Sequence, residues 1–172
     1  MRVSGTPKAS TEPASTSERV RAFWRRDPLL VLGPGVWRRC HDRFVRAVDR
    51  YHQMLESCGD GPARDSLEAD GARLAAALGS ALETCVASQR SWPSAGLDIP
   101  PGSDPVHRAL SQAAAAAAQA SEAAAMVRVA VRSGELDTAL ARAVAATRSV
   151  DVVSSKVAAA AAAGTGRAAR PG

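Results

Sequence analysis

The chain has 172 residues and is rich in alanine, with 38 of them against 31 residues of Leu, Ile, Val and Phe together. Because alanine is the best helix former, this composition favours closely packed helices over an unfolded chain. The net charge is +5, but arginine greatly outnumbers lysine. This bias is typical of a GC-rich coding sequence, and we favour it over nucleic-acid binding as the source of the basicity.

The same composition bears on where the protein works. The sequence contains no run of 18 apolar residues, which excludes a membrane-spanning helix, and its first residues lack the apolar core of a signal peptide. We therefore expect a cytoplasmic protein, in which the three cysteines are reduced thiols.

The N-terminal part of the chain divides into two segments. Residues 1–17 are mainly Ser, Thr, Pro, Gly and Ala, which predicts a disordered tail. Residues 18–35 begin as a short basic and aromatic helix, in which Phe23 and Trp24 lie among arginines, and continue as an extended, apolar Pro/Gly linker. We expect the short helix to pack onto the rest of the protein.

The best-patterned segment follows at Val36–Cys58. Its apolar residues recur at three- and four-residue steps, while charged residues occupy the opposite face. The resulting stripe consists of Trp37, Cys40, His41, Phe44, Ala47, Val48, Tyr51, Met54, Leu55 and Cys58. This pattern predicts an amphipathic helix that supplies most of the bulk of the core.

Three further helices are predicted after breaks that contain glycine and proline. They span residues 62–91, 105–133 and 135–163, and a disordered tail over 164–172 follows them. The residues of the last helix that we expect to face the core are Leu136, Leu140, Ala143, Thr147, Val150 and Val157. The connection 92–104 is long for a bundle, and we expect its Leu97 and Ile99 to fold over the end of the helices.

Together these elements predict an all-α fold. It is an antiparallel four-helix bundle over residues 36–163, alanine-rich, with a short extra N-terminal helix and disordered termini. If the first two helices close into a hairpin, Cys40 lies opposite Ala81, and Cys85 is then one turn too far away for a disulfide. We predict that both cysteines are small buried hydrophobes.

The sequence contains no recognised catalytic or metal-binding pattern. There is no Glu-x-x-His, C-x-x-C, H-E-x-x-H, Walker loop or G-x-S-x-G. We therefore predict a non-enzymatic protein with no cofactor and no metal site. His41 falls in the apolar stripe, and we expect a buried imidazole whose ring nitrogen is hydrogen-bonded. Glu122 interrupts a run of alanines, and we expect it at a solvated edge.

A row of arginines along the first predicted helix is the main candidate for an interaction surface. It consists of Arg39, Arg43, Arg46 and Arg50, which fall within about 60° of the helix surface. The row would suit an acidic partner, a phosphate backbone or an anionic membrane. The alternative is internal pairing, in which Asp42 binds Arg46 along the helix and Arg50 faces Asp70 of the next one. We favour internal pairing.

These features leave three functional hypotheses and one candidate interaction surface. That surface comprises Arg39, Arg43, Arg46, Arg50, Phe23 and Trp24. The absence of catalytic chemistry favours a helical-bundle interaction or accessory protein that binds an unknown protein partner or itself as a homo-oligomer. The first alternative, which we do not favour, is a basic module that binds nucleic acid or an anionic membrane. The second is a regulatory bundle that binds a small ligand.

Overall fold

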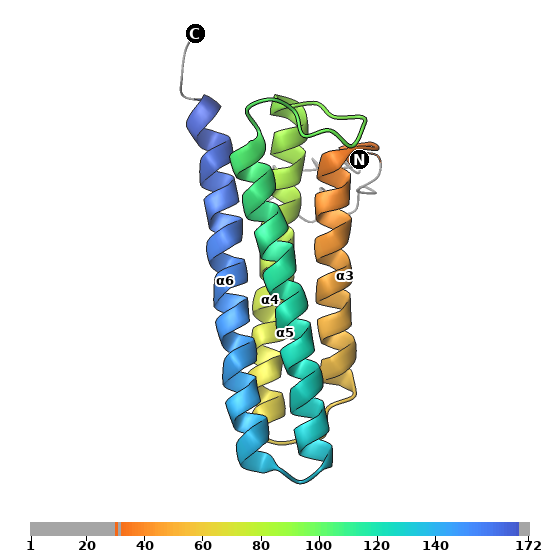
Figure 1. The fold of residues 1–172 in the computed structure, drawn as a ribbon, viewed down its shortest axis with the longest axis vertical. Coiled ribbons are helices and arrows are strands. Elements are labelled where there is room, and N and C mark those ends of the chain that lie inside the picture. The colour runs from red at the N-terminus through yellow and green to blue at the C-terminus, as the bar shows by residue number, and fades with distance from the viewer. Residues whose placement is uncertain (1–29, 31, 169–172) are drawn as a thin grey trace, which may run out of the picture.

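The computed structural model describes residue 30 and residues 32–168. Within this part of the chain four long helices run side by side and no β-strand occurs (Figure 1). They are α3 (Val36–Glu56), α4 (Pro62–Ser91), α5 (Asp104–Arg132) and α6 (Leu136–Ala168). The predicted all-α, alanine-rich four-helix bundle is confirmed. The predicted tail 1–17 and the short helix with Phe23 and Trp24 lie outside the described residues.

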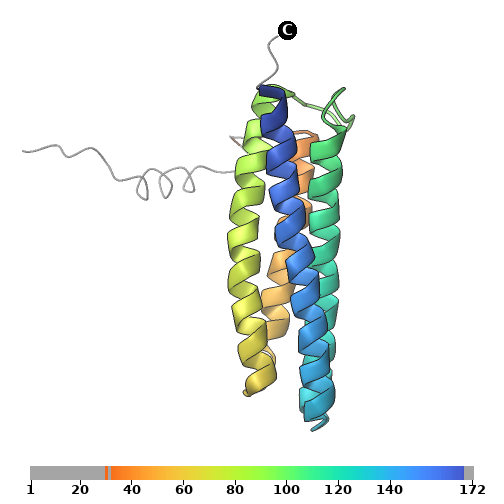
Figure 2. The ribbon, with the colours of Figure 1, turned by 90° about the vertical axis from the view of Figure 1, so that its left-hand side faces the viewer.

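The bundle consists of two antiparallel hairpins packed side by side (Figures 1 and 2). α3 pairs with α4, and α5 pairs with α6, while the hairpins meet where α3 lies along α5 and α4 along α6. Helices that meet between the hairpins run in the same direction. The consecutive helices α4 and α5 occupy diagonal corners and contact each other little, so their connection has to cross the end of the bundle. None of the described helices is both long and apolar enough to cross a membrane.

Large side chains from α3 join it to both ends of α4, as the apolar stripe predicts. Trp37, Phe44 and Tyr51 are buried. The Trp37 indole Nε1 donates a hydrogen bond to the carbonyl oxygen of Trp92 at 2.9 Å, and the Tyr51 hydroxyl donates to the carbonyl oxygen of Leu67 at 3.1 Å. The rings of Trp37 and Tyr51 therefore fill the core while their polar atoms keep hydrogen-bond partners.

The pair α5 and α6 packs mainly through small residues. The buried row on α6 is Ala139, Ala143, Ala146, Val150, Val153, Val157 and Ala160. The prediction that Leu136 and Leu140 face the core was wrong, because their side chains are 64% and 43% exposed. α6 is rotated so that alanines meet the alanine stripe of α5. Small side chains allow the two backbones to approach closely, and leucines in their place would hold the helices apart.

The connection over the end of the bundle also differs from the prediction. Leu97 is 60% exposed and Ile99 is exposed, whereas Trp92 and Ser94 are buried and hold the loop. The Ser94 hydroxyl accepts a hydrogen bond from the Val36 amide at 3.3 Å. Gly35 makes this approach possible, because its φ is +150° and a Cβ there would lie 2.2 Å from the Ser94 carbonyl oxygen.

Two segment boundaries need correction. Leu30 and Leu32 are helical where we predicted an extended linker, and Leu32 is buried in the core. At the other end α6 continues to Ala168, so residues 164–168 are helix and not part of a disordered tail. Two glycines at about 1 kcal/mol each are too weak to end a helix that a long alanine run propagates.

Candidate functional site

The arginine row lies on the exposed face of α3. Arg39, Arg43, Arg46 and Arg50 are all exposed. None of the four makes an ion pair or a hydrogen bond with another residue that the structure describes. The prediction of internal pairing was therefore wrong. Asp42 accepts a hydrogen bond from Arg38 at 2.6 Å, on the side away from Arg46, and Asp70 points towards α6.

Some arginines elsewhere in the bundle pair with carboxylates, whereas several others in the described part of the chain make no ion pair. Arg64 binds Glu68 at 3.0 Å, and Arg73 binds Asp70 at 3.1 Å. The rotation of α3 turns the row towards α5 instead of towards the acidic residues of α4. Four positive charges consequently lie together on one face with no compensating partner in the described chain.

Three of these arginines line a groove between α3 and α5 with a volume of about 530 Å³, which we call the arginine groove. Its lining residues are Arg43, Arg46, Ala47, Asp49, Arg50, Gln53, Ala114, Ala118 and Glu122. The groove exists because alanines on both helices leave the space between them unfilled. The Ser121 hydroxyl donates to the carbonyl oxygen of Ala47 at 2.8 Å and ties the two helices together there.

The charges around the groove are mixed but positive in sum. The arginines follow the α3 side, and two carboxylates, Asp49 and Glu122, also reach it. Glu122 is exposed, as predicted for a solvated edge. The groove thus combines an apolar middle with charged rims.

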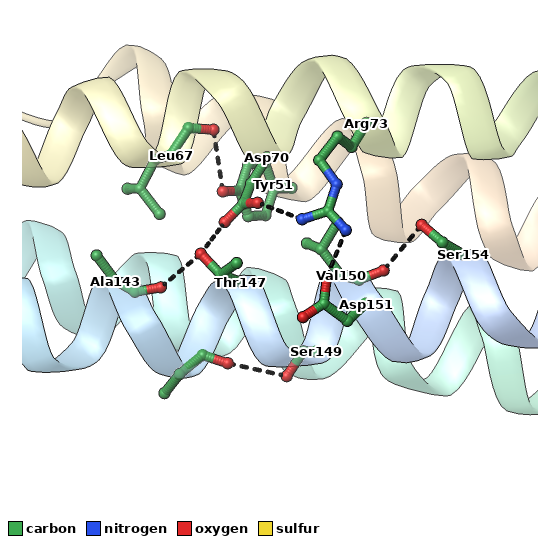
Figure 3. Close-up of polar contacts among 11 residues, drawn as sticks. Tyr51, Leu67, Asp70, Arg73, Ala143, Thr147, Ser149, Val150, Asp151 and Ser154 are labelled. Carbon is green, nitrogen blue, oxygen red and sulfur yellow. Dashed lines mark hydrogen bonds and ion pairs between the residues drawn. The ribbon is translucent and has the colours of Figure 1, made fainter.

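A buried polar network joins α4 to α6, and the sequence reasoning missed it (Figure 3). Asp70 is only 2% exposed. Its carboxylate accepts hydrogen bonds from the Thr147 hydroxyl at 2.6 Å and from the Arg73 guanidinium at 3.1 Å. Arg73 also pairs with Asp151. The available signal was the position of Asp70 between Leu67 and Leu74 at three- and four-residue steps, which places it in the core stripe.

This network is a structural connection between helices. Each oxygen of the Asp70 carboxylate has a partner, so the buried charge is compensated. Burial and the nearby negative charge of Asp70 raise the pKa of Tyr51, which keeps its hydroxyl protonated as a hydrogen-bond donor.

A second groove lies between α4 and α6, with a volume of about 410 Å³. It is lined by Arg73, Ala76, Ala77, Ser80, Ser154, Val157, Ala158 and Ala161. Its one charged side chain, Arg73, is already paired with two carboxylates. The groove therefore presents a largely apolar wall beside an arginine that is already paired.

Burial favours the uncharged forms of the thiols and the imidazole in the core. All three cysteines are free and buried, as predicted. Burial raises the pKa of Cys40 and of Cys85, so both thiols stay protonated and are poor nucleophiles. His41 is buried as expected, but its Nδ1 makes no hydrogen bond with a described residue and lies 3.6 Å from the Asp42 carboxylate. Burial lowers the pKa of His41 and favours the neutral ring.

No group of three His, Cys, Asp or Glu side chains in the described part of the chain is placed to hold a metal ion. The arginine groove is therefore the site with the clearest capacity to bind. No model of a known protein family matches the chain, and neither does any curated protein or any solved structure.

Proposed function

We propose that the chain is a non-enzymatic interaction protein that binds an acidic protein partner through the arginine face of α3. The observation that carries the proposal is the set of four exposed arginines without ion pairs beside an open groove. Exposed like charges repel one another and contribute nothing to folding. A partner with carboxylates would compensate these charges and gain charge-assisted hydrogen bonds.

The test compares two double substitutions that remove the same charge from different faces. Arg43→Gln with Arg46→Gln alters the groove, whereas Arg142→Gln with Arg148→Gln alters exposed positions of α6. We expect the first variant to elute from a heparin column at clearly lower salt than the parent, and the control variant to elute close to the parent. Both should melt like the parent, because these exposed arginines make no ion pair with a described residue, and surface substitutions of this kind change stability by about 0.5 kcal/mol or less. If both variants eluted at equally lowered salt concentrations, the proposal would be contradicted, because net charge alone would then explain the retention on heparin.

A basic module that binds nucleic acid or an anionic membrane is the second candidate, because the same arginine row would serve it. Gel shift with duplex DNA and flotation with anionic vesicles, each at two salt concentrations, distinguish it. In that case the groove variant should flatten the salt dependence by about two units of slope, one for each lost phosphate contact.

A further inference from the structure

We infer that the arginine groove receives an acidic amphipathic α-helix of the partner protein, lying along α3 and α5. This inference rests on the proposed function and goes further, because it specifies the secondary structure and the charge pattern of the partner. Three features of the groove carry it, namely its length, the small residues that line it and the placement of its charges.

The groove has the length and direction of a helix. α3 and α5 lie side by side and run in the same direction (Figure 1). The lining residues extend from Arg43 to Gln53 on α3 and from Ala114 to Glu122 on α5. Ten residues of helix span about 15 Å, which corresponds to about three turns of a third helix laid between the two.

Small residues between the rims allow a helix to approach closely. Ala47, Ala114 and Ala118 line the groove and extend only one carbon from the backbone. A helix docks by placing a ridge of side chains into such a groove. Single-stranded nucleic acid needs aromatic rings for stacking, and none lines this groove. A phosphate backbone would also meet the carboxylate of Glu122, opposite which a helix can place a basic residue.

The charges define the pattern that the partner has to carry. Arg43, Arg46 and Arg50 follow α3 at three- and four-residue steps, so they present one cation in each turn. Glu122 stands on the opposite side of the groove, on α5. A matching helix has carboxylates at three- and four-residue steps on one flank, small apolar residues in the middle and one basic residue on the other flank.

The probe for this inference is a synthetic alanine-based helical peptide of about four turns. It has glutamates at three- and four-residue steps on one flank and one lysine on the other. The control peptide has the same composition with its glutamates distributed around the helix. Fluorescence anisotropy of each labelled peptide is measured against the full chain at two salt concentrations. We expect the patterned peptide to bind about tenfold more tightly than the control.

Two variants separate groove binding from general attraction between charges. Ala118→Trp fills the groove without removing a charge, and Ala76→Trp places the same side chain in the α4/α6 groove as a matched control. We expect only Ala118→Trp to abolish the preference for the patterned peptide, with both variants retaining the parent's circular dichroism. A second variant, Glu122→Lys, reverses the charge on the α5 side of the groove and adds no bulky side chain. We expect it to bind most tightly a patterned peptide in which the lysine is replaced by glutamate.

The outcomes distinguish this inference from the proposed function. Equal binding of the two peptides, or a preference that survives Ala118→Trp, would overturn the helix-in-groove inference. So would tight, salt-steep binding of duplex DNA or anionic vesicles in the absence of peptide binding. The proposed function would fail if heparin retention did not depend on Arg43 and Arg46, whereas equal binding of the two peptides would leave that dependence intact. Binding of DNA or vesicles in place of the peptides would favour the second candidate, because dependence of heparin retention on these arginines is expected of both.

Discussion

Phe44 shows how much the stability of this bundle depends on a few large side chains. It is buried in the middle of α3, and the alanines that dominate α5 and α6 are too small to fill the space that it occupies. We predict that Phe44→Ala lowers the free energy of unfolding by about 3–5 kcal/mol, measured by chemical denaturation. Val129→Ala, at an exposed position of α5, should cost less than about 0.5 kcal/mol. A similar small loss for Phe44→Ala would contradict its place in the core.

A substitution of the single residue Thr147 tests how much the buried polar network contributes to stability. Its hydroxyl donates to the Asp70 carboxylate, so Thr147→Val keeps the shape of the side chain but leaves a buried carboxylate oxygen without its partner. We expect a loss of about 1–3 kcal/mol in unfolding free energy. Thr84→Val is the matched control, because the Thr84 hydroxyl bonds only the Ser80 carbonyl of its own helix. Equal losses of unfolding free energy in the two variants would mean that the hydrogen bond from Thr147 to Asp70 does not stabilise the protein.

At the scale of single elements, the contact between α5 and α6 depends on the smallness of its residues. Ala146 is completely buried in this contact, whereas its neighbour Ala145 is exposed. We predict that Ala146→Leu destabilises the protein by about 1–3 kcal/mol through overpacking, although leucine is otherwise a good helix former. Ala145→Leu should have little effect. Thermal melting of the two variants checks this, and a more stable Ala146→Leu variant would contradict the close packing of α6 on α5.

At the scale of the whole molecule, we expect the buried imidazole of His41 and the half-buried imidazole of His107 to make folding stability depend on pH. Burial lowers the pKa of His41 and of His107 below the ordinary value of 6.5. As the pH falls through 6.5, the unfolded chain therefore binds protons that the folded protein does not. The contribution of the neutral histidines to the free energy of unfolding is therefore complete above pH 6.5. Below this pH it declines, by at most about 1.4 kcal/mol per pH unit for each histidine.

We therefore predict that the unfolding free energy falls as the pH is lowered through and below 6.5, and that His41→Leu shows a shallower decline. Urea denaturation of the parent and the variant at several pH values measures the two slopes. Parallel curves would show that His41 is protonated equally in the folded and unfolded chains. Repeating the series with His107→Leu separates the contributions of the two rings.

The arrangement of the four helices is also a property of the whole molecule. Because α4 and α5 are diagonal, the parallel contacts α3/α5 and α4/α6 are made between helices that are not consecutive in the chain. The first of these contacts creates the arginine groove, and the second brings Thr147 to Asp70. Both the candidate site and the buried network thus depend on how the two hairpins pack.

Local patterns in the sequence predicted much of this structure. Glycines and prolines mark the breaks, so α4 has the predicted limits Pro62–Ser91, and the stripe of α3 was identified by its three- and four-residue steps. The arginine row was found in the same way. These features depend on residues within one or two turns of each other, and helix geometry relates such residues directly to a face.

The contacts between helices could not be predicted from the sequence, and only the tertiary structure revealed them. The rotation of α6, the burial of Asp70 and the unpaired state of the arginines all depend on which faces meet and how closely. In an alanine-rich helix, several rotations about the helix axis present an almost equally apolar face to the core. The choice among them rests on packing and on satisfying buried polar atoms across the bundle, and a periodicity within one helix carries no information about either.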